Sequence, residues 1–422
     1  MNSTAFHNAD ILIPRNEDMK KWSVIACDQY TSEPEYWEQV ENIVGDSRST
    51  LDLILPEIYL EQDGVDRRID NIHSAMDKYI ADDIFDEYKN AMIYVERVQS
   101  NGILRKGIVG AIDLEKYDFS KGSTSEVRAT EATVIERIPP RIKVRQGACL
   151  ELPHIMILID DPADTVIGML DAKKDSMKKL YDFELMQNGG SIKGYLIPED
   201  VQEEIDKALS ALADPDAFSK KYDLKDTPVL LYAMGDGNHS LATAKEFYEQ
   251  LKKSDPDKDF SNHPARFALA EIVDLHSDAL KFEAIHRLVY DVDCDKLMAE
   301  LTDALSLSET EVSDQYVICC VNGTEKKLYI NKKSSNLSVG SLQNFLDGYI
   351  KANGGKIDYI HGSDTVKNLA EKHSGFAFIL PDMDKSQLFP TVIKDGALPR
   401  KTFSMGHAED KRFYIEARKI TE

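Results

Sequence analysis

Residues 229–251 read VLLYAMGDGNHSLATAKEFYEQL, in which an apolar run ends in Gly-Asp-Gly-Asn-His-Ser and an amphipathic helical pattern follows at once. The glycines allow a positive φ angle and a close approach of a ligand to the backbone. The start of the following helix presents unpaired amide groups and a partial positive charge. This junction therefore predicts an anion site, most naturally for phosphate.

The side chains of the junction have distinct predicted roles. The phosphate or nucleotide is expected to be bound by Gly235, Gly237, Asn238, Ser240 and Lys245. Asp236 would repel a bare phosphate, so we expect it to bind Mg²⁺ or to accept the proton of a substrate hydroxyl. His239 has a near-neutral reference pKa and is expected to donate to an oxyanion or move a proton. The alternative is an ordinary strand-to-helix turn.

The junction requires a buried strand before it and a helix after it. VLLYAM is short, apolar and bounded by Pro228 and Gly235, as buried strands are. In the following segment, Leu241, Ala244 and Tyr248 fall on one helical face. Ser240 can act as the N-cap of this helix, or His239 and Ser240 can lie in its first turn.

Elsewhere the pattern alternates between strands and helices. Residues 33–44 have helical spacing, and Asn101-Gly102 predicts a hairpin between β-rich runs. Residues 163–225 are expected to be mostly helical and polar, and the tail 409–419, EDKRFYIEARK, to be an exposed strand or helix.

Together these segments predict a mixed α/β (α+β) protein of two domains, since 422 residues exceed one ordinary core. The expected division is a larger domain, residues 1–290, which holds the junction, and a smaller α/β domain, residues 291–422.

The composition limits the classes of function. A net charge of −23 argues against a nucleic-acid partner, whose phosphates would be repelled. Five scattered cysteines without a CxxC spacing argue against a disulfide framework or a zinc site. No apolar stretch approaches the roughly 20 residues that span a bilayer, and the N-terminus lacks a signal-peptide pattern. We expect a cytoplasmic protein with a small-molecule substrate and no membrane partner; a homo-oligomer is possible.

Several stretches resemble one bacterial and archaeal family, called domain of unknown function ten-fifteen. GDGNHSLATAK resembles its Asp-Gly-His-His-Arg signature, with Asn238 at a histidine position and Ser240 at the arginine position. Residues 24–37, 127–162 and 282–290 resemble further segments of the family in order, and so do GFAFILPDMD and LPRKTFSMG. The signature is in turn similar to the phosphate-binding turn of the ParB/sulfiredoxin-like fold, which includes archaeal free-serine kinases.

The resemblance implies a ParB/sulfiredoxin-like nucleotide-binding core that transfers a phosphoryl group to a small hydroxyl compound such as free serine. ATP or ADP would be the donor, with Mg²⁺ near Asp236. Serine in place of arginine removes a bidentate phosphate clamp, so phosphate binding is the firmer implication. Two alternatives stay open: a non-catalytic nucleotide- or metabolite-binding module, and a hydrolase in which Asp236 and His239 activate water.

Further candidates come from the other resembling segments and from positive charge that is rare in an acidic chain. They are Arg128, Glu131, Thr133, Arg137, Asp28, His286, Arg287 and Lys401. Arg128 is expected on a phosphate and Glu131 on a metal or a substrate amine, whereas Asp28 is a second candidate base. Solvated loops and structural hydrogen bonds are the alternative explanation for each of them.

Overall fold

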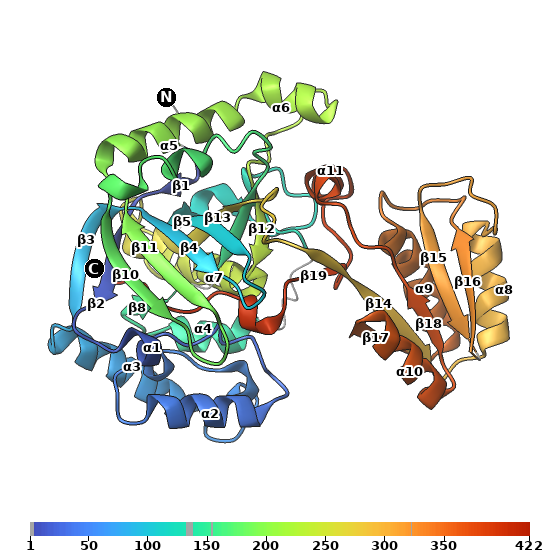
Figure 1. Cartoon of the computed structure of the whole chain (residues 1–422), viewed down its shortest axis with the longest axis horizontal. Coiled ribbons are helices and arrows are strands. Elements are labelled where there is room, and N and C mark those ends of the chain that lie inside the picture. The colour runs from blue at the N-terminus through green and yellow to red at the C-terminus, as the bar shows by residue number, and fades with distance from the viewer. Residues whose placement is uncertain (1–3, 132–137, 153–154, 322) are drawn as a thin grey trace. The chain divides into compact units, whose positions relative to one another are not determined.

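The computed structural model describes residues 4–131, 138–152, 155–321 and 323–422 and divides into two compact units (Figure 1). The first unit comprises Met1–Ala129, Thr133–Leu280 and His407–Glu422, and the second comprises Thr130–Ala132 and Lys281–Gly406. This partition differs from the predicted division at residue 290 in two places. Strand β14 (Phe282–Tyr290) belongs to the second unit, and the C-terminal residues return to the first.

A mixed sheet of ten strands, counted over the described residues, forms the centre of the first unit. In spatial order its strands are β10 (Lys178–Glu184), β11 (Ser191–Leu196), β4 (Ile93–Val98), β5 (Leu104–Asp113), β13 (Phe267–Asp274), β9 (Met156–Ile159), β12 (Tyr232–Asp236), β7 (Val127–Arg128) and β6 (Tyr117–Asp118), with β1 (Phe6–His7) beside β5. β9 is parallel to β13 and antiparallel to β12. Two small sheets pair β2 (Ala9–Pro14) with β3 (Phe85–Ala91) and β8 (Leu150–Glu151) with β20 (Arg418–Lys419).

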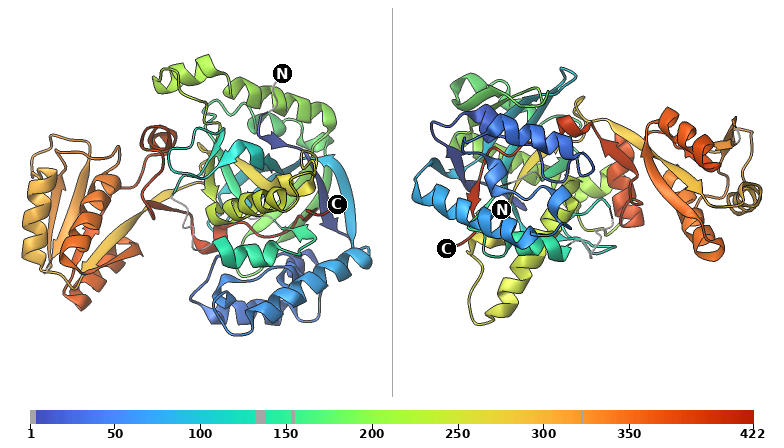
Figure 2. Two further views of the ribbon diagram at one scale, coloured as in Figure 1. Left: turned by 180° about the vertical axis from the view of Figure 1, so that it is seen from behind. Right: turned by 90° about the horizontal axis from the view of Figure 1, so that it is seen from below.

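Helices cover this sheet on both faces. They are α1 (Met19–Trp22), α2 (Pro34–Val44), α3 (Val65–Ala81), α4 (Ile138–Arg145), α5 (Glu199–Leu212), α6 (Pro215–Tyr222) and α7 (Asn238–Ser254), with short 3₁₀ turns such as η1 (Thr50–Leu53) and η2 (Glu57–Tyr59). Seen from behind, α7 and α4 lie across one face of the sheet (Figure 2). The fold is therefore mixed α/β, as the sequence predicts.

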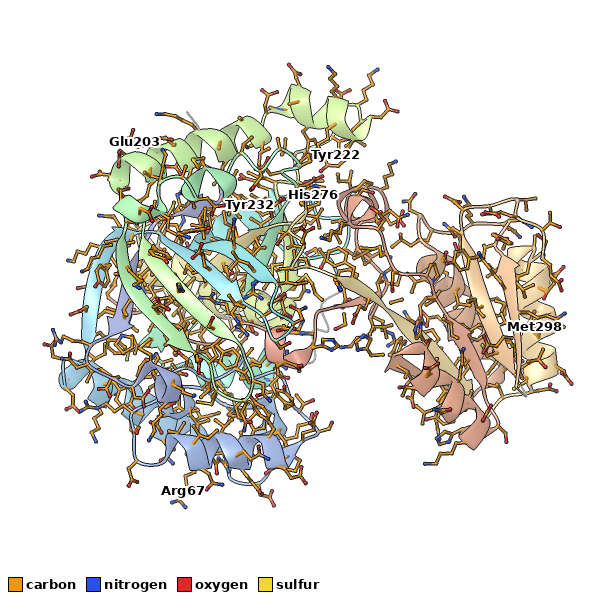
Figure 3. The ribbon with its side chains drawn as sticks, viewed as in Figure 1. Arg67, Glu203, Tyr222, Tyr232, His276 and Met298 are labelled. Carbon is orange, nitrogen blue, oxygen red and sulfur yellow. The ribbon has the colours of Figure 1, made fainter. Side chains whose placement is uncertain are left out.

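Alternation along the strands divides the core between the two faces. Ile108 of β5 packs with Leu241 of α7 in one hydrophobic cluster, whereas its neighbour Val109 packs with Trp37 of α2 in another. Successive residues of a strand point to opposite faces, so a doubly covered sheet needs apolar residues at both. Tyr232 of β12 is buried in the first cluster, whereas Arg67 and Glu203 are exposed (Figure 3).

The second unit holds a separate antiparallel sheet of six strands among the described residues. Its elements are β14, α8 (Cys294–Leu305), β15 (Tyr316–Val321), β16 (Thr324–Tyr329), α9 (Ser338–Asn353), β17 (Lys356–His361), α10 (Ser363–His373), β18 (Phe376–Ile379), α11 (Leu388–Asp395) and β19 (Phe403–Met405). Across the described part of both units, no helix combines the length and the apolar character needed to cross a membrane.

The expectation of a mostly helical segment at 163–225 is wrong for its middle part. Residues 178–196 form the β10–β11 hairpin, and helices begin only at α5. A β-carbon on Gly194 would lie 2.2 Å from the Tyr181 ring, so this glycine is needed for the ring to pack across the hairpin. Cross-strand packing of this kind overrides a weak helical pattern.

The C-terminal tail is also not exposed, contrary to the sequence expectation. Phe413, Tyr414 and Ile415 are buried, and the tail runs antiparallel to residues 24–26. The Tyr414 amide donates to the Val24 carbonyl, and the Trp22 indole donates to the Ile415 carbonyl. The tail is thus an internal part of the first unit.

A buried ion cluster fixes this tail against the sheet. The Arg412 guanidinium pairs with both Glu271 and Glu416, and Arg105 lies 3.6 Å from Glu271. Burial raises the pKa of Glu271, but the guanidinium groups of Arg105 and Arg412 outweigh burial and hold it below its usual range. Gly107 is required beside the cluster, since a β-carbon there would lie 2.4 Å from the Glu271 Oε1 atom.

Carboxylates also gather where the parallel strands β9 and β13 end. Asp160 is paired with His276 and Lys221 and also accepts from Tyr222 (Figure 3). Asp274 is buried, and its Oδ1 atom accepts a hydrogen bond of 3.3 Å from the Asp161 amide. Burial raises the pKa of Asp274 to about 6.

Replacement of Arg412 by methionine tests the ion cluster. Arg412→Met leaves Glu271 and Glu416 buried without their main counter-charge, so we expect the free energy of unfolding to fall by about 3–5 kcal/mol. Trp22 and Trp37, the two tryptophans of the chain, both lie in the first unit and report its denaturation by fluorescence. Lys143→Met, which removes the exposed ion pair with Asp66, should leave the unfolding curve almost unchanged. Equal effects of the two changes would contradict the assignment.

Asp274→Asn tests the raised pKa. The Asp274 carboxyl binds its proton more tightly in the folded protein than in the unfolded chain. Its contribution to stability is therefore present below pH ~4 and is lost as pH rises through its folded pKa of about 6. The variant cannot ionise and should be more stable than the parent by on the order of 1–3 kcal/mol at pH 8, with no gain at pH 4. Denaturant titrations at both pH values measure this. The exposed Asp257→Asn change is the control and should not alter the pH profile.

Candidate functional site

The predicted junction joins β12 to α7 through Gly237. This glycine is the N-cap of α7, with φ 79° and ψ 28°, and no side chain caps the helix. Ser240 therefore lies in the first turn, the second of the two predicted arrangements, because glycine takes the left-handed conformation at the junction most readily. The first turn also contains no acidic residue, so no side-chain carboxylate within it offsets the positive end of this 17-residue helix.

Asp236 is engaged by two protein groups. Its Oδ1 atom accepts from the Gly237 amide at 3.0 Å, and its Oδ2 atom lies 3.3 Å from the Lys411 ammonium. Both side chains are largely buried, with 17% and 13% exposed. The Gly237 amide is thus already bonded within the protein. Of the backbone amides at 237–240 that were expected to bind the anion, those from Asn238 onward remain. Lys411 brings to the junction a cation that sequence reasoning missed.

The remaining polar groups of the first turn differ in their surroundings. The Asn238 Oδ1 atom is buried and accepts no hydrogen bond from any residue in the described ranges. The His239 carbonyl accepts from the Thr243 hydroxyl at 2.7 Å. Lys245 forms an ion pair with Glu249 one turn further along α7, at 2.7 Å. Lys245 is therefore neutralised locally, and the structure places its ammonium beside a carboxylate.

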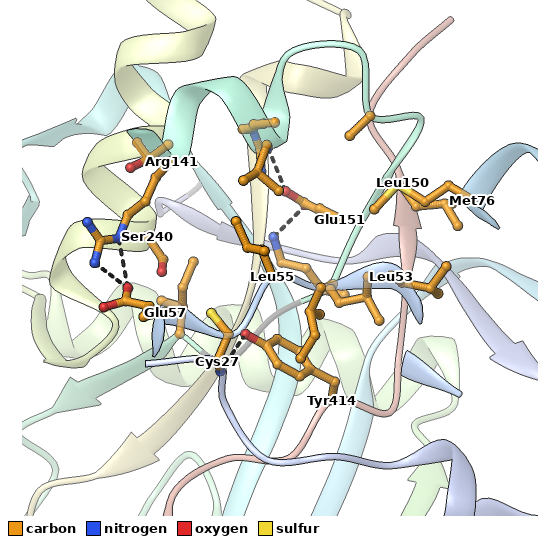
Figure 4. A pocket seen from close by; sticks show the side chains of 18 of the residues that line it. Cys27, Leu53, Leu55, Glu57, Met76, Arg141, Leu150, Glu151, Ser240 and Tyr414 are labelled. Carbon is orange, nitrogen blue, oxygen red and sulfur yellow. Dashed lines mark hydrogen bonds and ion pairs between the residues drawn. The ribbon is translucent and has the colours of Figure 1, made fainter. Parts of the chain in front are cut away.

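A cavity of about 160 Å³ begins beside this first turn. Ser240 and Thr243 of α7, Arg141 of α4, Glu57 of η2 and Cys27 contribute its polar lining (Figure 4). Helix α4 packs on α7 through Ile138, Ile142 and Ala242, which holds Arg141 next to the helix start. The cavity is thus assembled from parts of the first unit that lie far apart in the chain.

Arg141 and Glu57 form an ion pair at the edge of this cavity. The Arg141 Nε atom donates to Glu57 at 2.8 Å, and both side chains are mostly buried, with 14% and 18% exposed. Burial, together with the charges of Asp28 and Glu57, raises the pKa of the Cys27 thiol far above its usual range. Cys27 is therefore a neutral thiol and not a nucleophile. Asp28 follows it directly and accepts from Gln29 at 3.0 Å.

Arg128 has a structural environment. Its Nε atom donates to the Ser125 carbonyl at 2.8 Å and its Nη2 atom to the Pro228 carbonyl at 2.9 Å. Burial lowers the pKa of this guanidinium. Because Pro228 precedes β12 and the junction follows it, these donors hold the opposite end of the strand from the glycine turn.

Four other predicted residues belong to the second unit: Glu131, His286, Arg287 and Lys401. Arg287 is buried and donates to Gln343, to the Ile285 carbonyl and to the carbonyls of Arg400 and Lys401. Burial raises the pKa of Glu131, opposed by Lys401, and His286 accepts from the Leu380 amide at 3.2 Å. Thr133 and Arg137 lie outside the described residues.

The structure therefore places Ser240 in one cavity with Glu57 and Arg141, and Asp236 beside Lys411. Sequence reasoning did not select Glu57, Arg141 or Lys411. Arg141 falls within the family-like segment 127–162, and Lys411 is a cation in an acidic tail, so both carried a weak signal. Glu57 carried none, because it lies in a short turn without a recognisable pattern. Glu57 and Arg141 are 84 residues apart in the chain, and Asp236 and Lys411 are 175 residues apart. Local sequence patterns therefore do not reveal that these residues are neighbours.

Comparisons with solved structures matched several proteins at low identity. A conserved hypothetical protein from Pyrococcus furiosus is 11% identical with a TM-score of 0.37, over 74% of this chain and 95% of that chain. A free serine kinase in complex with AMP is 11% identical with a TM-score of 0.38, over 74% and 92%. SbnI with a C-terminal truncation from Staphylococcus aureus is 9% identical with a TM-score of 0.35, over 73% and 82%. A search of the curated proteins found no match.

The sequence model of one protein family matches residues 11–349, well over half of the chain. The match spans the junction, α4 and η2, and it confirms the family that the motifs predict. The chain belongs to the family described as Protein of unknown function (DUF1015).

Proposed function

We propose that the first unit binds the phosphates of ATP or ADP at the start of α7 and transfers a phosphoryl group to a small hydroxyl compound in the adjoining cavity. In this proposal the sheet and α7 correspond to a ParB/sulfiredoxin-like core. One observation carries the proposal: a long helix, capped only by glycine and with no acid in its first turn, starts at the polar edge of a cavity.

Helix geometry supports binding of a phosphate oxygen at this position. Amides of a first helical turn point along the helix axis toward a ligand, and the helix dipole favours negative charge. The Gly237 amide is occupied by Asp236, so the remaining cradle lies from Asn238 onward. The proposed site therefore has fewer backbone amides than the sequence predicts, and they begin at Asn238 and not at Gly237.

Lys411 supports the proposal by replacing the charge that the family signature places at position 240. Its ammonium lies 3.3 Å from Asp236 at the start of α7. The ion pair with Asp236 holds the Lys411 side chain at the junction. A bound phosphate would then share this ammonium with Asp236.

The cavity volume supports separate binding positions for the nucleotide donor and the hydroxyl acceptor. At about 160 Å³ it is close to the size that accepts a benzene ring and well below the roughly 300–1,000 Å³ of pockets for larger ligands. A nucleotide therefore lies outside it, at the start of α7, and the acceptor lies inside. The polar edge with Ser240, Arg141 and Glu57 is where the acceptor hydroxyl meets the phosphate.

In the reaction, the acceptor oxygen bonds to the terminal phosphorus while the bond from phosphorus to the bridging oxygen breaks. The hydroxyl proton passes to a carboxylate, and the shortened nucleotide leaves. Glu57, in the cavity wall, is placed to accept this proton, with Asp28 beside Cys27 as the second candidate. Catalysis of this kind depends on positioning and electrostatics more than on covalent chemistry.

The described residues do not fit a magnesium ion held by the protein alone. No group of three or more His, Cys, Asp or Glu side chains within them is arranged to hold a metal ion. Asp236, the predicted ligand, is paired with Lys411. Mg²⁺ therefore stays a prediction tied to the nucleotide phosphates, which supply most ligands of this ion in many enzymes.

One observation favours a non-catalytic binding module as the second candidate. The two carboxylates of the proposed site, Asp236 and Glu57, are each paired with a cation. A module that only binds a nucleotide or metabolite would need the same cradle and no free base. The product of the reaction decides between the two candidates.

Lys411→Met tests the phosphate site. Methionine keeps the backbone carbonyl that Arg97 binds and removes the ammonium, so we expect ATP and ADP affinity to fall roughly 10- to 100-fold, as for loss of a charged hydrogen bond. Isothermal titration calorimetry with and without Mg²⁺ measures this. Lys253→Met, at the exposed far end of α7, should bind like the parent. Absence of nucleotide binding by the parent protein would exclude the kinase and a nucleotide-binding module.

Glu57→Gln tests the reaction. With a nucleotide and a panel of amino acids, polyols and aliphatic alcohols, the parent should yield a phosphorylated acceptor and the shortened nucleotide in equal amounts. Loss of the base should lower kcat by about 10²–10⁴-fold while nucleotide affinity is retained. Glu61→Gln, a change at an exposed glutamate nearby, is the control. Nucleotide binding without any product would support the binding module, and nucleotide consumption without a phosphorylated acceptor would support a hydrolase.

A further inference from the structure

The cavity next to α7 changes character along its length. Its polar edge is formed by Ser240, Arg141 and Glu57, whereas its other end is formed by Leu53, Met76 and Leu150, from η1, α3 and β8 (Figure 4). These three apolar residues belong to one hydrophobic cluster of the first unit. A ligand that fills the cavity therefore meets polar groups at one end and a hydrocarbon wall at the other.

Two charged groups lie near the apolar end. The Arg145 Nε atom is buried and has no hydrogen-bond partner among the described residues, whereas Glu151 is fully bonded within the protein. Glu151 accepts from Arg418 at 2.8 Å, from Arg145 at 2.6 Å and from the Leu269 amide at 2.9 Å. Burial raises the pKa of Glu151, but Arg418 and Arg145 outweigh burial and keep the group ionised. Glu151 therefore offers little to a second polar group on a ligand, and a polar group placed against Leu53, Met76 and Leu150 would lose its hydration without a replacement.

The volume sets the size of the apolar part. An engineered apolar cavity of roughly 150 Å³ is known to bind benzene, so about 160 Å³ holds a body of about six carbon atoms. A hydrocarbon body in the cavity makes van der Waals contacts with the leucine and methionine side chains that line it. Free serine, with an ammonium and a carboxylate on its short body, fills neither the volume nor the apolar wall.

We propose that the acceptor is a small alcohol with an apolar body of up to about six carbons, aliphatic or aromatic, and not free serine. Its hydroxyl lies at the Ser240 and Glu57 edge, and its body lies against Leu53, Met76 and Leu150. This inference rests on the proposed function for the role of the hydroxyl, whereas binding in the cavity requires no nucleotide.

Ligand-observed NMR titration of the full chain with straight-chain 1-alkanols from ethanol to octanol, and with free serine, tests the inference without nucleotide. Affinity should rise about three- to fourfold with each methylene and stop rising at about six carbons. Met76→Gln should weaken hexanol binding by tenfold or more and leave ethanol binding unchanged. Ala148→Leu, which fills part of the cavity, should move the limit to shorter alcohols. Met298→Gln in the second unit is the matched control (Figure 3).

An affinity that does not depend on chain length, hexanol binding that survives Met76→Gln, or serine that binds more tightly than hexanol would overturn the inference. The two proposals fail separately. If alkanols bind as expected but no phosphorylated product forms, the apolar ligand class stands and the kinase reaction falls. If serine is phosphorylated and alkanols neither bind nor react, the reaction stands and the apolar acceptor falls.

Discussion

The buried charge of Glu271 is the constraint on which the first unit depends. A carboxylate at the centre of a sheet is tolerated only when cations surround it, and here Arg412 and Arg105 do so. Arg412 comes from the C-terminal tail, so the tail cannot leave without exposing the sheet to an unpaired charge. Gly107 provides the space for this arrangement. The ion cluster therefore anchors the C-terminal tail to the central sheet.

This anchoring also determines the candidate site. Arg97 donates to the carbonyls of Glu409 and Lys411, and Arg105 donates to that of Asp410, so the backbone around Lys411 is held along its length. The Lys411 ammonium is thereby fixed next to Asp236 at the start of α7. A stabilising element and the cation of the proposed phosphate site therefore share one short segment. Changes in the ion cluster are therefore expected to affect both folding and the electrostatics of the junction.

The proposed function requires an acidic protein to bind an anionic ligand. A net charge of −23 repels phosphate at long range, but screening limits that effect to about 10 Å at ordinary salt. In the proposal, the positive groups within that distance are the amides at the start of α7, Lys411 and Arg141. Each of these two cations is paired with a carboxylate. The local arrangement of charge would then matter more to phosphate binding than the total charge of the chain.

The sequence by itself determined the mixed α/β class, many helices and strands, the family and the glycine junction, because hydrophobic period and turn residues act over a few neighbours. It did not determine the β10–β11 hairpin, the buried tail or the two-unit boundary. It also missed Glu57, Arg141 and Lys411, and it selected Arg128, whose donors hold backbone carbonyls. These features depend on contacts between residues far apart in the chain, where burial decides which charges pair and which surfaces meet. Only the tertiary structure contains those contacts.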